Sequence, residues 1–171
     1  MLEIALDTDA EWDSNGQGST SWAPLVRKAA DVAIAESAYP ELARSGRPVE
    51  ISVTLTGDDQ VRALNAKWRG KDKATNVLSF PMADERDLMR ANVSDVELLL
   101  GDIILARGIC EAEAADKGVS VEDHATHLIV HGTLHLLGYD HQDDRDCADM
   151  ETREVRALER LGIANPYEVT A

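Results

Sequence analysis

Residues 127–141, HLIVHGTLHLLGYDH, decide the fold, because they predict a long core helix that ends at a glycine. Apolar residues surround the histidines of this stretch, and the helical pattern extends from about Glu122 to Leu137. Gly138 follows directly, and glycine accepts the positive φ with which many helices end. Residues three and four apart share one face of a helix. The face defined in this way carries His124, His127, His131 and His135.

The spacing of these histidines predicts a metal site. His131 and His135 lie one helical turn apart, which is a standard way for a helix to offer two nitrogens to one ion. His141 comes three residues after Gly138 and can fold back as a third ligand. Three imidazoles leave one tetrahedral position open, as in catalytic zinc sites. We therefore expect one Zn²⁺ per chain, and surface histidines without a function are the less favoured interpretation.

The same spacing is typical of metzincin-type zinc proteases, so a metalloprotease is the first alternative. Those enzymes carry Glu directly after the first histidine ligand, where it acts as general base. The corresponding position here is Gly132. Asp140, beside His141, is a candidate substitute, but capping or orienting the turn is an equally good role for it.

The rest of the chain predicts one mixed α/β domain of residues 1–171, with about four strands and several helices packed on them. Alternating or continuous apolar runs indicate strands at 2–7, 49–56, 76–80 and 98–106. Helical spacing indicates helices at 23–38, from Asp58 onward, after the strand at 98–106 to about 117, at 122–137 and at 143–161. Asp58 and Asp59 form an N-cap signature. We expect polar loops at 11–22 and 82–97.

Composition and charge limit the possible functions. The 171 residues are 44% hydrophobic and 29% charged, as in an ordinary globular domain. We find no basic signal region and no apolar run near the roughly 20 residues that span a bilayer. We therefore expect a cytoplasmic protein in which Cys110 and Cys147 are inert thiols. The net charge of −15 opposes broad affinity for nucleic acid, because such binding needs Lys and Arg to neutralise phosphates.

One segment is basic despite this total. Residues 61–75 carry five positive charges (Arg62, Lys67, Arg69, Lys71, Lys73) and one negative charge (Asp72), which leaves +4. If the fold brings this segment to the metal, Arg69 can bind a phosphate through two parallel hydrogen bonds. Lys71 and Lys73 are then candidates for binding substrate beside it. The alternative is a solvated loop, and for Trp68 core packing is favoured over stacking on a base.

The other polar residues near the histidines have structural interpretations. We expect His127 to pack or to orient its neighbours, and His124 to be exposed near the start of the helix. Three acidic residues could form a second metal site, but capping the last helix is favoured for them. These residues are Asp143, Asp144 and Asp146.

HLIVHGTLHLLGYDH resembles the signature of the YbeY-type bacterial endoribonucleases. Three further segments are similar to that family: LNAKWRGKDKATNVLSFP (64–81), LGDIILA (100–106) and GIANPY (162–167). The likeness implies a small α/β sheet flanked by helices. It also implies that His131, His135 and His141 are zinc ligands and that Arg69 is functionally important.

The resemblance implies a zinc-dependent endoribonuclease that acts on single-stranded regions of ribosomal RNA, with Arg69 and His131 as its catalytic residues. It further implies a role in 16S rRNA 3′-end maturation and ribosome quality control. The expected partners are RNA, the small ribosomal subunit and its assembly factors, and no membrane. Two alternatives stay open: a zinc metalloprotease-like hydrolase, and a non-catalytic ribosome-assembly factor with structural zinc.

Overall fold

The computed structural model describes residues 2–13, 22–44, 46–89, 97–140 and 143–167, and these residues have a mixed α/β fold. Its strands within these ranges are β1 (Leu2–Thr8), β2 (Val49–Thr56), β3 (Val77–Pro81) and β4 (Leu98–Ala106). They form one sheet in the order β1-β2-β4-β3. β1, β2 and β4 are parallel, and β3 pairs with β4 in the antiparallel direction. β3 is therefore an edge strand.

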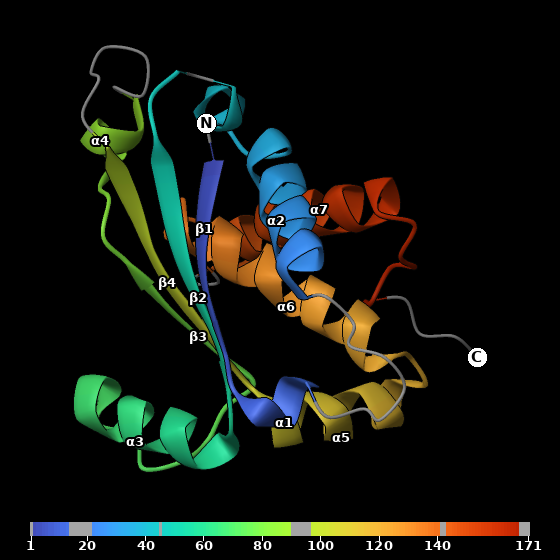
Figure 1. Cartoon of the computed structure of the whole chain (residues 1–171). Coiled ribbons are helices and arrows are strands. Elements are labelled where there is room, and N and C mark those ends of the chain that lie inside the picture. Colours follow the sequence, from blue (N-terminus) through green and yellow to red (C-terminus); the bar gives the residue numbers. More distant parts are fainter. Residues whose placement is uncertain (1, 14–21, 45, 90–96, 141–142, 168–171) are drawn as a thin grey trace.

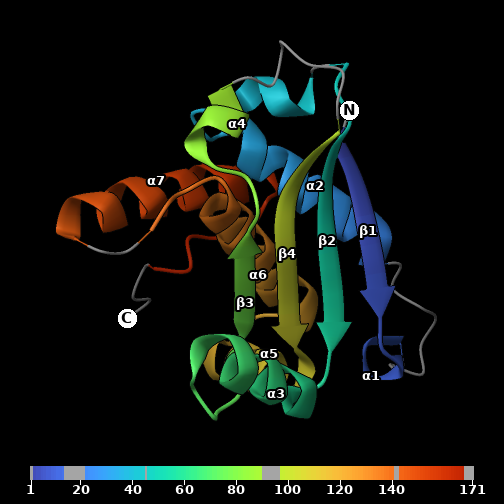
Figure 2. The ribbon, with the colours of Figure 1, turned by 90° about the vertical axis from the view of Figure 1, so that its left-hand side faces the viewer.

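The helices lie mostly on one face of the sheet. They are α1 (Ala10–Asp13), α2 (Trp22–Ala35), α3 (Asp58–Arg69), α4 (Glu85–Met89), α5 (Arg107–Lys117), α6 (Val121–Leu136) and α7 (Asp144–Arg160), with a 3₁₀ helix at Pro40–Ala43. α2, α6 and α7 lie on the same side of the sheet (Figure 1). α3 and α5 lie across one end of it, and the other face of the sheet is toward the viewer in Figure 2.

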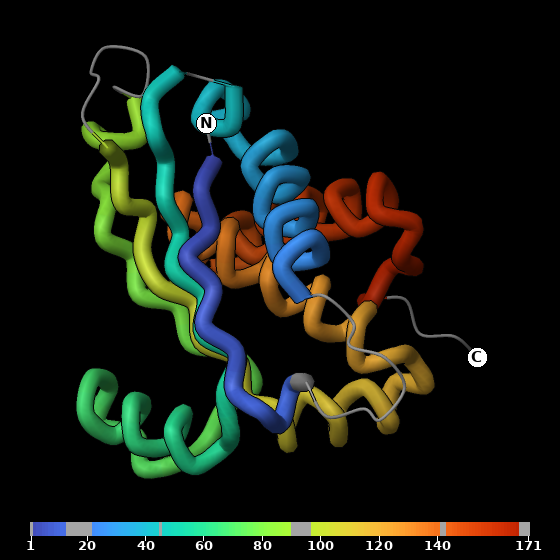
Figure 3. Tube along the Cα trace, in the orientation of Figure 1, coloured from blue at the N-terminus to red at the C-terminus, as the bar shows by residue number. Residues whose placement is uncertain are grey.

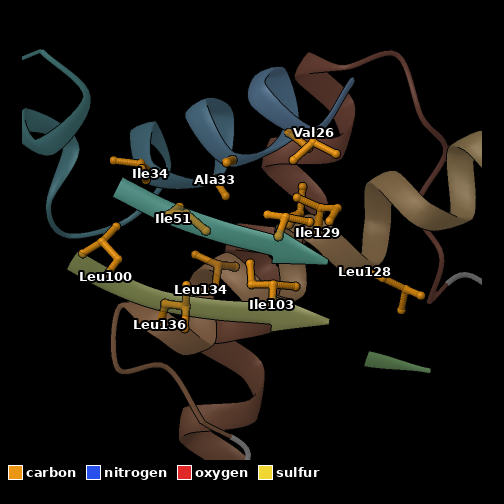
Figure 4. Packing of buried hydrophobic residues seen from close by; sticks show 14 of the residues in the cluster. Val26, Ala33, Ile34, Ile51, Leu100, Ile103, Leu128, Ile129, Leu134 and Leu136 are labelled. Carbon is orange, nitrogen blue, oxygen red and sulfur yellow. The ribbon is translucent and has the colours of Figure 1, made fainter. Parts of the chain in front are cut away.

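Helix α6 is the centre of the core. It contacts α2, α5 and α7 as well as β3 and β4, and the Cα trace shows α2 crossing it (Figure 3). Figure 4 shows Ile129 and Leu134 of this helix among Ile51 of β2, Ile103 of β4 and Ala33 of α2. All five side chains are fully buried or nearly so. Burying a large aliphatic side chain stabilises the fold by roughly 1.5–3 kcal/mol, so this layer is the main source of stability.

Two glycines allow backbones to approach closely. A Cβ at Gly132 of α6 would lie 3.1 Å from Ile103 Cγ2, so the helix backbone packs directly against the side chain of Ile103 in β4. Gly101 of β4 has a φ of +142°, and a Cβ there would lie 2.2 Å from the carbonyl oxygen of Phe80. Gly101 follows a register shift between β2 and β4 that leaves Leu100 as an extra residue, which is a β-bulge.

The four predicted strands and the mixed α/β class are confirmed. The predicted loop at 11–22 is wrong in part, because α1 forms where buried Trp12 donates its indole N–H to Thr56 O at 2.9 Å. The predicted loop at 82–97 is also wrong in part, because α4 interrupts it. There, Asp84 and Asp87 each accept a hydrogen bond from the other's backbone N–H, at 2.9 and 3.0 Å, which caps the helix start. The remaining parts of these loops, 14–21 and 90–96, lie outside the described residues.

The N-cap predicted at Asp58 and Asp59 is one residue late. Gly57 is the N-cap of α3, and Asp58 is already helical. The Asp58 carboxylate instead accepts a hydrogen bond from the backbone N–H of Ile109 at 3.2 Å, which ties α3 to α5. Among the helices that the structure describes, none has the length and apolar character needed to cross a membrane.

We expect Gly101→Ala to destabilise the protein, because the new methyl group would meet the Phe80 carbonyl and the residue would have to keep a positive φ. The expected loss in the free energy of unfolding is about 2–4 kcal/mol, measured by urea denaturation. Gly46→Ala is the matched control, since nothing lies within 4 Å of a Cβ at that position. Equal effects of the two substitutions would contradict the close approach at Gly101.

Candidate active site

A pocket of about 500 Å³ lies where the end of α6 meets β3 and the end of α3. Segments that are far apart in the sequence form its lining, and much of that lining is polar. The lining residues are Arg69, Asn76, Val77, Ser79, Pro81, His131, His135, Gly138, Tyr139 and Asp140. The edge strand and the histidine helix therefore both contribute to the lining of one site.

His131 and His135 face each other in this pocket. Their Nε2 atoms are 3.0 Å apart. His131 Nδ1 is hydrogen-bonded to Glu154 Oε1, and His135 Nδ1 lies 2.8 Å from the carbonyl oxygen of Tyr139. Since a carboxylate and a carbonyl only accept, each Nδ1 carries the proton and each Nε2 presents a lone pair. Two lone pairs that converge in this way suit a shared cation, so the donor set fits a metal ion.

Glu154 of α7 anchors the histidine face from behind. Its side chain has no exposed surface, and it accepts hydrogen bonds from His131 Nδ1, from the Tyr167 hydroxyl and, at 3.2 Å, from His127 Nε2. Burial by itself raises the pKa of this carboxyl, but the hydrogen bonds from the two histidines and from Tyr167 outweigh it and lower the pKa to about 2. Glu154 is therefore an ionised, fully buried carboxylate that fixes the orientation of His131.

His124 has a structural role that differs from the prediction. It was expected to be exposed, but it is 3% exposed, because α5 packs over the start of α6. Its Nε2 lies 2.9 Å from Glu113 Oε1, and the same oxygen accepts a hydrogen bond from Asn76 Nδ2 at 3.0 Å. Burial lowers the pKa of His124, against the raising effect of Glu113. This chain of contacts links α6 and α5 to the start of β3 at the wall of the pocket.

His127 matches the role that its spacing suggested. It is buried, and its Nε2 contacts Glu154 rather than pointing into the pocket. Its ring lies edge-on to that of His131, with the centroids 6.4 Å apart. It therefore packs beside the histidine pair and shares the carboxylate that orients it.

Arg69 brings the basic segment to the histidine pair. It is the last residue of α3, which ends because Gly70 adopts a left-handed φ of +68°. Arg69 Nη2 donates to the carbonyl oxygen of Ser79 at 3.1 Å, and its guanidinium lies over the Phe80 ring, 5.7 Å from the centroid. Both contacts are with β3. The side chain is thus held against the pocket wall while it stays exposed.

The remainder of the basic segment stays at the surface. Arg62 is paired with Asp72 at 2.8 Å, so its charge is locally compensated. Lys71 and Lys73 are exposed and are not among the residues that line the pocket. The core position favoured for Trp68 is wrong, because its side chain is 63% exposed. α3 extends past the small cluster that it packs against, so its last turn has no core to enter.

The third predicted ligand, His141, lies outside the described residues. In the part of the chain that the structure describes, no three His, Cys, Asp or Glu side chains are grouped to hold a metal. Of the three predicted ligands, the described residues include His131 and His135, which lie together. Asp140 lines the pocket beside this pair. Asp143 caps α7 by accepting a hydrogen bond from Asp146 N at 2.8 Å, as favoured for the acidic cluster.

The two cysteines and Gly132 have structural roles. Cys110 and Cys147 are both free thiols. Burial raises the pKa of Cys110 to about 12, so this thiol is unreactive. Gly132 takes the position of the glutamate of a protease, and the Cβ of a larger residue there would lie 3.1 Å from Ile103 Cγ2, which is a tight contact. The space beside Gly132 is filled by the packing of α6 against β4.

The sequence interpretation missed Glu154 and Tyr167. A signal for Glu154 was present, because it lies on the apolar stripe of α7 with Met150, Ala157 and Leu158, which are all buried. A charged residue on such a stripe needs a buried partner. Tyr167 follows the last helix in an irregular segment, and no periodicity indicates which residue its hydroxyl contacts.

Comparison with known proteins identifies the family. Residues 12–162 match the family model described as Endoribonuclease YbeY. A relative of that name from Rhizorhabdus wittichii is 48% identical over 99% of both chains, and one from Sphingopyxis alaskensis is 50% identical over 98% of both. A Thermotoga maritima protein determined in solution has a TM-score of 0.51 at 22% identity, over 99% of this chain and 100% of its own, which supports the fold alone. The chain belongs to the Endoribonuclease YbeY family.

Proposed function

We propose that this protein is a zinc-dependent endoribonuclease that cleaves single-stranded RNA. The observation that carries the proposal is that Arg69, His131 and His135 line one pocket. This arrangement places a phosphate-binding guanidinium opposite a pair of nitrogens suited to a cation. Membership of an endoribonuclease family supports RNA as the substrate.

The proposed zinc ligands are His131, His135 and His141. The separation of 3.0 Å between the first two Nε2 atoms suits nitrogens that bind the same ion at about 2.0–2.1 Å. His141 is included because of its spacing in the sequence. A bound zinc ion supplies a Lewis acid for the reacting phosphate. Other divalent ions that favour imidazole would fit the same donors. Zinc is proposed because three histidines with one open position are a usual ligand set of catalytic zinc.

Arg69 is proposed to bind the scissile phosphate. A guanidinium can donate two parallel hydrogen bonds to phosphate oxygens, and its charge offsets the negative charge that develops on them during the reaction. The contacts of Arg69 with Ser79 and Phe80 hold it in place before substrate arrives. Lys71 and Lys73 are proposed to contact flanking phosphates, because they follow Arg69 closely in the chain and are exposed.

Two alternatives have less support. A metalloprotease needs a general base after the first ligand, and Gly132 is packed against Ile103. A non-catalytic factor with structural zinc would be expected to enclose its metal in four protein ligands. Here the two histidines face a pocket that also holds an arginine, which favours a site that admits substrate.

The cellular role is proposed from the motif resemblance. The RNA would be ribosomal, with cleavage contributing to 16S rRNA 3′-end maturation and to ribosome quality control. The partners would be the small ribosomal subunit and its assembly factors, in the cytoplasm. Residues 1–171 would act as a single domain.

Arg69→Ala and His131→Ala should each slow RNA cleavage. Loss of a positioned cation at a developing charge costs about 10²–10³-fold in kcat, and loss of a metal ligand should cost at least as much. The measurement is single-turnover cleavage of a single-stranded oligoribonucleotide by the zinc-loaded protein. Removing zinc from the wild type with a chelator should abolish cleavage, and adding zinc back should restore it.

Arg62→Ala is the matched control for these substitutions. It removes a cation from the same helix, but one that is paired with Asp72 and lies outside the pocket. Its cleavage rate should stay within about twofold of wild type, as expected for an exposed ion pair. Undiminished cleavage by the zinc-free wild type would sink the proposed function. Cleavage that survives each of the three His→Ala substitutions would point to a contaminating nuclease.

Glu154→Gln should weaken zinc binding by about 10–100-fold, the usual effect of removing a residue that orients a ligand histidine. Glu154 contacts His131 Nδ1 and no pocket surface, so the effect would be on metal affinity. Competition with a chromophoric chelator measures the Kd, and urea denaturation checks folding. Glu159→Gln, at an exposed position of the same helix, is the control. An unchanged Kd in a folded Glu154→Gln variant would refute the orienting role.

A further inference from the structure

Trp68 is a large aromatic side chain in an exposed position. Its exposed fraction is 63%, whereas those of Trp12 and Trp22 are 2% and 3%. The indoles of the two buried residues donate to backbone carbonyl oxygens, at 2.9 and 2.8 Å respectively. All three tryptophans of the chain are thus described, and they divide into two core residues and one surface residue.

Trp68 lies on the apolar stripe of α3. It follows Val61 by seven residues and Leu64 by four, which places the three on one face of the helix. Val61 and Leu64 pack in the small cluster that also contains Leu78 and Ile104, and Trp68 belongs to neither buried cluster of the described residues. α3 lies across the end of the sheet (Figure 2). Val61 on its apolar stripe is buried, whereas Trp68 at the end of the stripe is exposed. The ring therefore presents an aromatic surface to solvent.

The surroundings of Trp68 are positively charged. Lys67 Nζ lies 5.0 Å from the centroid of the Trp68 ring. Lys67, Arg69, Lys71 and Lys73 are all exposed, and of the nearby acids Asp72 is already paired with Arg62. In a chain with a net charge of −15, these exposed cations form a locally positive surface that attracts polyanions. An aromatic ring among cations is the pattern with which proteins bind single-stranded nucleic acid.

Trp68 is also next to the active-site pocket. It directly precedes Arg69, so the two Cα atoms are about 3.8 Å apart. Arg69 lines the pocket and contacts β3, whereas the side chain of Trp68 is exposed to solvent. A strand whose phosphate is held at Arg69 would carry a neighbouring base past this ring.

We propose that Trp68 is a stacking platform for a base adjacent to the phosphate bound at Arg69. The inference rests on the proposed function, and it adds the reason for a single-stranded substrate. Bases in a duplex are stacked on each other and cannot lie on a protein ring, whereas an unpaired base can. Because every base has a π face, the platform favours unpaired nucleotides with little preference for sequence.

Tryptophan fluorescence tests the contact directly. Iodide should quench Trp68 in the free protein and leave buried Trp12 and Trp22 largely unaffected. Titration of the zinc-loaded protein with a six-nucleotide single-stranded oligoribonucleotide should change the Trp68 emission and protect it from iodide. In Trp68→Phe both responses should disappear, because only the buried tryptophans remain. A gel run after the titration shows how much of the oligonucleotide was cleaved during it, so that only the response of intact RNA is compared.

Affinity measurements separate stacking from charge. Trp68→Ala and Trp68→Leu should weaken binding by about 5- to 100-fold, and Trp68→Phe by much less, because Phe keeps a π face. The salt dependence of binding should be unchanged in the Trp68 variants, whereas Lys71→Ala should reduce its slope by about 0.7. Val119→Ala, at an exposed apolar position between α5 and α6, is the control and should bind as wild type does.

Each other result overturns the proposal. If Trp68→Leu binds as well as Trp68→Phe, the contact is not stacking. If the oligonucleotide binds and is cleaved in an Arg69-dependent way while Trp68 emission is unchanged, the inference fails and the proposed function stands; the ring is then left for a protein partner. If the wild type neither binds nor cleaves RNA, both fail together.

Discussion

The contact between α6 and β4 at Gly132 is the constraint on which the rest of the structure depends. With no side chain at this position, the helix approaches Ile103 closely, and its rotation about its own axis is fixed. Successive helical residues are about 100° apart, so His131 points to a different side of α6 from Gly132. There it contacts Glu154 of α7 and lines the pocket together with residues of β3. The same helix can therefore fill the core with Ile129 and Leu134 and keep a polar face for the site. A larger residue at 132 would disturb the core and the histidines together.

Glu154 provides hydrogen-bond acceptors for the buried histidines of α6. A stripe of histidines on a core helix brings ring nitrogens into a buried region, where each needs a partner. One carboxylate serves His127 and His131 at once, and the Tyr167 hydroxyl supplies a further donor. Burying an ionised carboxylate is costly, and these donors offset the cost, as its lowered pKa reflects. The negative charge also lies behind the histidine pair, where it favours a cation in front of it.

The sequence was sufficient for whatever depends on local periodicity. The four strands, the long helix and its glycine end follow from spacing along the chain, and His131 and His135 had to meet because they are one turn apart. Contacts between distant segments were not predictable in the same way. The order β1-β2-β4-β3 and the pairing of Glu154 with His131 across 23 residues depend on packing that spacing does not encode. For Trp68 the sequence favoured core packing, and this was wrong because the point at which the sheet ends depends on tertiary structure.

The net charge of −15 can now be reconciled with an anionic substrate. Attraction between exposed charges is screened beyond about 10 Å at ordinary salt, so a ligand responds to the charges near it and not to the total. Lys67, Lys71 and Lys73 are exposed and lie close to Arg69 in the chain, and acidic residues elsewhere disfavour adsorption at other faces. An acidic protein with one basic segment therefore holds a polyanion weakly and in one place. Under those conditions, local contacts at the pocket must supply most of the binding, and the proposed metal ion, the Arg69 guanidinium and the Trp68 ring are the groups to which we assign it.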